Sequence, residues 1–203
     1  MTLPYTMKIF PQEQVVLRTC WLLLGSMLMF CMMQFCDSDA QPTKAVAYVE
    51  WQVKAAYLYK FGSYVEWPEH TFPGADSPLV IGIVDADALA DELIKIAANH
   101  TINGRSVSVR KLRVDEPVTD VNVLFISGAN RERNADIFAA VRGLPVLTVT
   151  DADGGLTQGG MINFMLVDGH VRFEAAPKIA KQNNLSISAR LLAAAYRVAP
   201  EAL

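Results

Sequence analysis

The sequence predicts an α/β fold: a largely parallel sheet of about five to six strands with flanking helices and a C-terminal β-hairpin. Three observations lead to this fold. Short apolar runs such as Leu79–Val84 are typical of parallel strands that are covered on both faces. Segments of helical periodicity, about a dozen residues long, separate the strands and indicate right-handed βαβ crossovers. Near the end of the chain, Asp168-Gly169 is a strong two-residue turn signal between two strand-like segments.

Residues 1–40 differ in composition from the rest and predict a signal peptide or an N-terminal membrane anchor, whereas residues 41–203 form the predicted α/β domain. The segment Thr19–Cys36 holds no charge over 18 residues and follows Lys8 and Arg18. This charge asymmetry would keep the N-terminus in the cytoplasm and carry the rest of the chain across the membrane. We therefore expect an exported protein.

The length of the apolar segment leaves two outcomes open. Its 18 residues are near the minimum for a membrane span and somewhat long for the core of a signal peptide. Small residues ahead of Gln41 favour cleavage after Ala40. A chain cleaved there would have no disulfide and would depend on packing for its stability, because it would lose all three cysteines: Cys20, Cys31 and Cys36.

The domain is predicted to begin with an amphipathic helix within Lys44–Pro68. Apolar side chains recur at steps of three and four, and Lys54 and Lys60 fall outside that stripe. Gly62 or the approach to Pro68 would end the helix. The apolar positions are Val46, Val49, Val53, Tyr57, Phe61 and Tyr64.

The segments that follow alternate between strand and helix. Leu79–Val84 predicts a buried strand, and Asp85 or Asp87 can cap a helix over Ala88–Asn99. The Asn103-Gly104 turn leads into a half-buried strand. That strand covers 105–114, and the pattern repeats as strand, helix and strand over 121–127, 130–143 and 144–151.

The last part of the chain predicts a hairpin and a closing helix. Strands over 161–167 and 170–175 are joined by Asp168-Gly169. A helix within 186–198 would carry Arg190 and Arg197 on one side. Its other side would pack Ile187, Leu191, Leu192 and Ala195.

No complete catalytic or cofactor-binding motif is present in the sequence. The glycines between 154 and 160 lack the spacing of a dinucleotide fingerprint and of a phosphate loop. Asp151–Gly155 resembles the start of a calcium loop, but Leu156 and Ile162 stand where glycine and glutamate are needed. No serine lies in a Gly-x-Ser-x-Gly elbow. We therefore expect no enzymatic activity and no cofactor.

Two other classes of function are also disfavoured. The histidines, His70, His100 and His170, are far apart in the sequence and show no metal-ligand spacing, so we expect no metal site. A net charge of −3 and scattered basic residues argue against a surface for nucleic acid.

Two groups of residues are candidates for binding. Gly159 and Gly160 allow a sharp turn into a strand, and Asn163 is a polar side chain that must find partners inside the fold. Small ligands bind at the loop-lined ends of such sheets, so the candidate ligand-binding residues are Gly159, Gly160, Met161 and Asn163. Tyr59 and Trp67 fall off the helical stripe in an aromatic-rich segment and are the candidate partner-binding residues.

Five blocks of the sequence, in this order, resemble the YfiR family of exported bacterial proteins. They are Val53–Pro68, Val123–Ser127, Pro145–Asp151, Gly159–Glu174 and Leu185–Val198. The resemblance implies a small α/β periplasmic domain, often dimeric, that acts as a regulator and not as an enzyme. Such a protein holds the sensor domain of an inner-membrane diguanylate cyclase inactive, which lowers cyclic di-GMP and limits biofilm growth. An outer-membrane lipoprotein can sequester it.

The chain departs from the family pattern at two places. Val121 and Asn122 stand where a cysteine commonly precedes the next strand, which puts redox control of folding in doubt. Ala176 replaces the asparagine that usually follows the last strand. A periplasmic small-molecule binding protein that serves a transporter or sensor kinase is the alternative function.

Overall fold

The computed structural model describes residues 41–113, 115–129 and 131–200. The expected signal peptide or anchor and the three cysteines lie outside the described residues. Val46–Leu203 group as one compact unit. Within the described part of the chain, no helix combines the length and the hydrophobicity that a membrane span requires.

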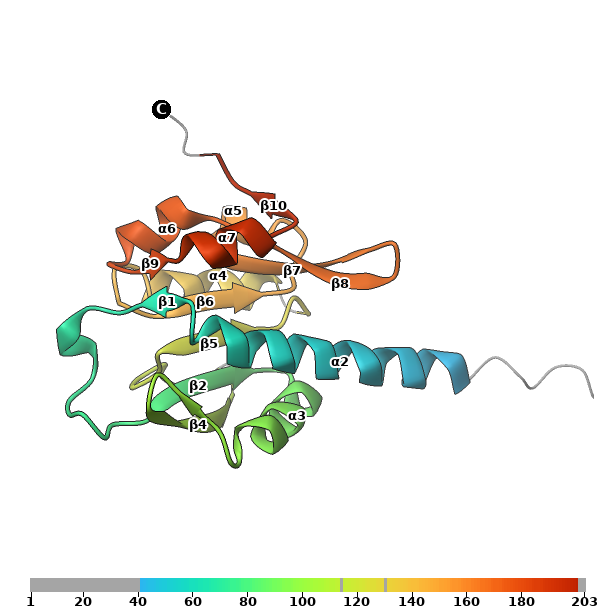
Figure 1. Ribbon diagram of the computed structural model, residues 1–203. Helices are drawn as coiled ribbons and strands as arrows, with labels where there is room; N and C mark the ends of the chain where they lie inside the picture. Colours follow the sequence, from blue (N-terminus) through green and yellow to red (C-terminus); the bar gives the residue numbers. More distant parts are fainter. Residues whose placement is uncertain (1–40, 114, 130, 201–203) are drawn as a thin grey trace, which may run out of the picture. The chain divides into compact units, whose positions relative to one another are not determined.

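A mixed sheet of eight strands forms the centre of the fold (Figure 1). Its strands are β2 (Leu79–Val84), β3 (Thr101–Ile102), β4 (Arg105–Leu112), β5 (Val123–Ile126), β6 (Leu147–Thr150), β7 (Ile162–Val167), β8 (His170–Ala175) and β10 (Arg197–Val198). They lie in the order β10-β8-β7-β6-β5-β2-β4-β3. The strands from β7 to β4 in that order run parallel to one another, and β3, β8 and β10 run in the opposite direction.

The α/β class is confirmed, but the predicted sheet was wrong in strand number and in direction. The sheet has eight strands instead of about five to six, and it is mixed instead of largely parallel. The unpredicted strands β3 and β10 have two residues each, which is too short to produce an alternating pattern. β3 pairs with only Arg105 and Ser106, so among the described residues no strand lies beside the outer edge of β4 from Val107 onward.

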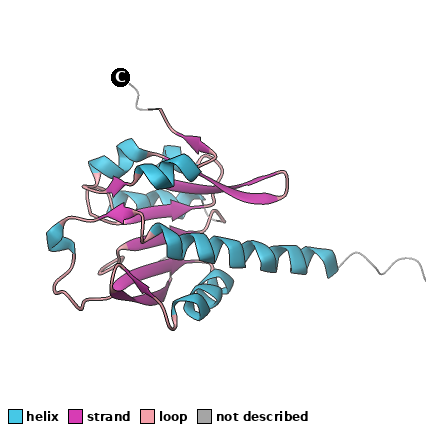
Figure 2. Ribbon diagram, viewed as in Figure 1, coloured by secondary structure: helices cyan, strands magenta, loops and turns pink. Residues whose placement is uncertain are grey.

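Helices cover both faces of the sheet (Figure 2). Phe125 of β5 packs in one core with Leu58 of the first described helix. The preceding residue, Leu124, lies on the other face of β5 and packs in the opposite core with Phe138 of the helix that follows β5. The first two helices of the described chain therefore cover one face, and the helix after β5 covers the other. The helices are α2 (Gln41–Phe61), α3 (Asp87–Ala97), α4 (Arg131–Ala140), α5 (Gly155–Gln158), α6 (Pro177–Gln182) and α7 (Ala189–Ala194), with a short 3₁₀ turn, η1 (Glu69–Thr71).

Both predicted two-residue turns are confirmed. Asn103 and Gly104 have φ of 51° and 82°, and Asp168 and Gly169 have φ of 50° and 72°. Asparagine, aspartate and glycine are the residues that adopt positive φ at least cost, which is why these pairs can close a hairpin. The second turn joins β7 to β8 and sets Asn163 opposite Glu174.

The predicted closing helix is shorter than expected. α7 holds six residues and begins at Ala189, with Ser188 accepting a hydrogen bond from the Leu191 amide at its start. Ile187 belongs instead to β9 (Ser186–Ile187), which pairs with β1 (Val65–Glu66) in a separate two-stranded sheet. Arg197 belongs to β10. The spacing of the apolar residues suited a helix over the whole predicted segment. Pairing with distant strands instead makes both ends of that segment extended.

Candidate functional site

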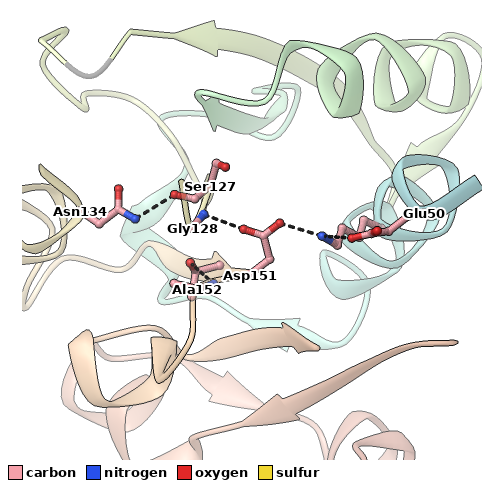
Figure 3. A network of polar contacts seen from close by, with 8 residues as sticks. Glu50, Ser127, Gly128, Asn134, Asp151 and Ala152 are labelled. Carbon is pink, nitrogen blue, oxygen red and sulfur yellow. Dashed lines mark hydrogen bonds and ion pairs between the residues drawn. The ribbon is translucent and has the colours of Figure 1, made fainter. Parts of the chain in front are cut away.

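A polar cluster at the carboxyl ends of β5 and β6 is the candidate functional site (Figure 3). Parallel neighbours end at the same edge of a sheet, so the loops that follow β5 and β6 lie side by side. α2 adds two charged side chains to this edge. We call the group the Lys54 cluster; it consists of Glu50, Lys54, Ser127, Gly128, Asn134, Thr150, Asp151 and Ala152.

Lys54 lies at the centre of the cluster. Its Nζ donates to Asp151 Oδ2 at 2.7 Å and lies 2.6 Å from Glu50 Oε1. The Nζ also lies 4.8 Å from the centroid of the Trp51 ring. Only 6% of the Lys54 side chain is exposed, so these contacts replace the water that the ammonium would otherwise bind.

The loop after β5 is held against the loop after β6 by the second oxygen of Asp151. The Gly128 amide donates to Asp151 Oδ1 at 2.6 Å. A Cβ at Gly128 would lie 2.7 Å from the Cα of Ala152, so the two backbones touch where only glycine fits. Asn134 of α4 is buried and donates from Nδ2 to the Ser127 carbonyl at 2.8 Å. Helices on opposite faces of the sheet are thus both tied to these two loops.

The contacts in the Lys54 cluster are those of a structural link. Among its described members, no hydroxyl or thiol is hydrogen-bonded to a basic side chain, which is the arrangement that nucleophilic catalysis uses. The ammonium is engaged by two carboxylates, and both Asp151 oxygens have donors. The cluster therefore fixes α2 to the edge of the sheet where ligands of α/β proteins commonly bind.

An open cavity with a volume of about 1130 Å³ lies at the carboxyl ends of β2 and β4. Arg110 beside it donates to Glu116 at 3.3 Å. Within the described residues, no group of three or more His, Cys, Asp or Glu side chains is arranged to hold a metal ion. The charged side chains at this opening are Asp85, Asp87, Arg113, Asp115, Glu116, Arg133 and Asp136.

The structure separates the four predicted ligand-binding residues. Gly159 lines a cavity of about 410 Å³, and Gly160, Met161 and Asn163 are buried and are not part of its lining. Asn163 finds its partner across the hairpin, where its Nδ2 donates to Glu174 Oε1 at 3.0 Å. Its Oδ1 is buried with no hydrogen-bond partner in the structure.

The two predicted partner-binding residues are both half-buried and pack against the main core. Tyr59 donates its hydroxyl to the Thr101 carbonyl at 2.8 Å. The Trp67 ring meets the Phe72 ring edge-on, with centroids 6.2 Å apart. Each therefore has a structural contact and also presents part of its ring to solvent.

Lys54 is a residue of the site that the sequence pattern did not identify. Both Lys54 and Lys60 fall outside the apolar stripe, but Lys54 is buried whereas Lys60 is exposed. The partner that buries Lys54 is Asp151, 97 residues further along the chain. The sequence did hold one signal for this contact, because Asp151 is a carboxylate that directly follows a buried strand. An aspartate at that position is equally expected in a turn, so the signal did not identify a partner for Lys54.

Comparison with known families agrees with the predicted resemblance. A family model described as YfiR/HmsC-like matches residues 51–196 of the chain. A comparison with curated proteins gives no match. The matched range contains Lys54, Asp151 and the cavity beside Gly159.

Proposed function

The chain belongs to the YfiR/HmsC-like family, and we propose that it is a periplasmic regulatory protein that binds and inhibits the sensor domain of an inner-membrane diguanylate cyclase. Inhibition would lower cyclic di-GMP. The observation that carries the proposal is the family match over residues 51–196, which suggests a regulator of the diguanylate cyclase system. The uncharged segment Thr19–Cys36 supports export to the periplasm.

We place the partner surface around Tyr59 and Trp67. Aromatic side chains that are partly exposed and held rigidly are common anchors of interfaces. Tyr59 is fixed by its bond to the Thr101 carbonyl, and Trp67 by its contact with Phe72. An outer-membrane lipoprotein and a second copy of the chain are further partners that the family suggests.

The proposal is tested by cellular cyclic di-GMP in a strain that lacks this gene. We expect the level to rise, and the rise to disappear when the gene of the partner cyclase is also removed. A level that stays the same in the single deletion would rule out an inhibitor. A rise that persists without the cyclase would rule out this route of action.

The surface is tested by binding of the purified sensor domain to variants. We expect Trp67→Ala and Tyr59→Ala to weaken binding by roughly tenfold or more, as for interface anchors. Tyr48→Ala is the matched control, because Tyr48 is a more exposed aromatic residue on the same helix as Tyr59, with 51% of its surface accessible. Equal effects of all three changes would argue against the proposed surface.

One observation favours the alternative function, a periplasmic small-molecule binding protein that serves a transporter or sensor kinase. The cavity beside Gly159 has a volume of about 410 Å³, which is within the usual range for a small ligand. This function would leave cyclic di-GMP unchanged in the deletion strain.

A further inference from the structure

The cavity beside Gly159 is formed by the ends of three helices that are far apart in the sequence. The chain that leaves α4 supplies Arg142 and Gly143, α5 leads into Gly159, and α6 leads into Asn183. Asn183 is buried, and its Oδ1 accepts a hydrogen bond from the Gly143 amide. That bond ties two walls of the cavity together.

The wall at Gly159 is held in place by Thr148 of β6. The Thr148 hydroxyl donates to the Gly159 carbonyl at 3.1 Å and accepts from the Met161 amide at 3.2 Å. Gly159 has φ of 117°, and a Cβ there would lie 3.3 Å from the Cβ of Phe138. The turn is therefore preformed, as small-ligand sites usually are.

The lining of the cavity combines uncharged polar side chains with a group of apolar side chains and one cation. Phe138 and Val141 of the lining are 4% and 2% exposed, and Leu156 and Ile179 are half-buried beside them. The lining includes one charged residue, the exposed Arg142, and no carboxylate. Among the described residues, no acidic side chain pairs with Arg142.

One polar atom of the lining is left without a partner. Gln158 donates from Nε2 to the Asp153 carbonyl at 3.1 Å, but its Oε1 is buried with no hydrogen bond in the structure. A buried acceptor is satisfied only by an N–H or O–H donor, so an occupant completes this wall only if it carries such a donor in addition to its anionic group.

We propose that this cavity is a binding site for a small organic anion with an apolar body. The apolar part would lie against Phe138, Val141 and Leu156, and the anionic group would pair with Arg142. Arginine binds a carboxylate through two parallel hydrogen bonds, which suits an acid with a planar carboxylate. The site does not depend on the proposed regulatory function.

The test uses the full chain and a matched pair of probes, phenylacetate and its neutral amide, phenylacetamide. Binding is followed by the NMR shifts of the Gly143, Gly159 and Asn183 amides, one from each wall. We expect phenylacetate to shift all three and to bind at millimolar concentration. Arg142→Gln should weaken phenylacetate binding roughly tenfold and leave phenylacetamide within about twofold.

Two further variants make the result decisive. Arg133→Gln removes the same charge from an exposed position on α4 and does not line this cavity, so phenylacetate binding should be unchanged. Ile179→Trp should fill the cavity and abolish binding of both probes. Absence of shifts at the three amides, or equal losses in Arg142→Gln and Arg133→Gln, would overturn the proposal. Either result leaves the cyclic di-GMP experiment unaffected, so the two proposals can fail separately.

Discussion

The Nζ of Lys54 lies 2.7 Å from Oδ2 of Asp151, and this contact joins α2 to the residue that follows β6. The Lys54 and Asp151 side chains are 6% and 15% exposed. Removing one member of a buried ion pair leaves the other charged group without its partner. We expect Lys54→Met to lower the free energy of unfolding by about 2 to 3 kcal/mol in urea denaturation.

The double variant Lys54→Met with Asp151→Asn separates the ion pair from other effects of these changes. We expect a coupling energy of at least about 1 kcal/mol between the two positions. Lys111→Met is the matched control, because the Lys111 and Asp91 side chains are 42% and 57% exposed and their ion pair should contribute little to stability. If the effects of the two single changes on the free energy of unfolding simply add in the double variant, the contact between Lys54 and Asp151 is not energetically important.

Gly128 should tolerate no side chain. In Gly128→Ala, the new Cβ would meet the backbone of Ala152 at 2.7 Å and the Asp151 carbonyl oxygen at 2.9 Å. Backbone atoms cannot move aside cheaply, so we expect a loss of about 2 kcal/mol or more in the same denaturation experiment. Gly74→Ala is the control, because its Cβ would meet only Ser77 Oγ, at 3.6 Å, and we expect a change within about 0.5 kcal/mol.

Glu92 should make folding sensitive to acid. A hydrogen bond from Lys95, at 2.6 Å, is the main cause that lowers the pKa of Glu92 below its ordinary value. A carboxyl group with a lowered pKa in the folded state stabilises the fold above its unfolded pKa, and this contribution is lost as the pH falls through the folded pKa. We expect Lys95→Met to raise the pKa of Glu92 in a carboxyl NMR titration. An unchanged pKa of Glu92 in this variant would show that groups other than Lys95 lower it.

Arg197 should fasten β10 to the sheet. Its Nε donates to Glu174 Oε2 at 2.9 Å, and this hydrogen bond to the Glu174 carboxylate raises the pKa of the Arg197 guanidinium. In Arg197→Met we expect hydrogen exchange of the Tyr196 and Ala199 amides, which bond to β8, to become roughly tenfold faster. Arg172→Met, an exposed change within β8, should leave both rates unchanged.

The elements that could be predicted from the sequence are those with local signals. Leu79–Val84 was predicted with the bounds that β2 has, because a strand covered on both faces is apolar throughout. The hairpin followed from Asp168-Gly169, and a two-residue turn also fixes which residues face each other. The pairing of Asn163 with Glu174 could therefore have been predicted from that turn.

The elements that were missed depend on contacts between distant residues. β1 and β9 have two residues each and pair Val65 with Ile187, so neither segment holds a pattern of its own. The burial of Lys54 depends on Asp151 in the same way. At the candidate ligand site, Gly159 was predicted from its turn, whereas Arg142 and Asn183 meet it only through the packing of α4 and α6.

The outer edge of β4 has a consequence for the behaviour of the protein in concentrated solution. In the part of the chain that the structure describes, β3 covers only the first two residues of β4, so the backbone from Val107 onward is open to a strand from another molecule. Arg110 and Lys111 stand near the end of that edge, where two copies pairing side by side would bring like charges together. Charged side chains on an edge strand disfavour pairing with another molecule, so we expect Arg110 and Lys111 to reduce edge-to-edge aggregation.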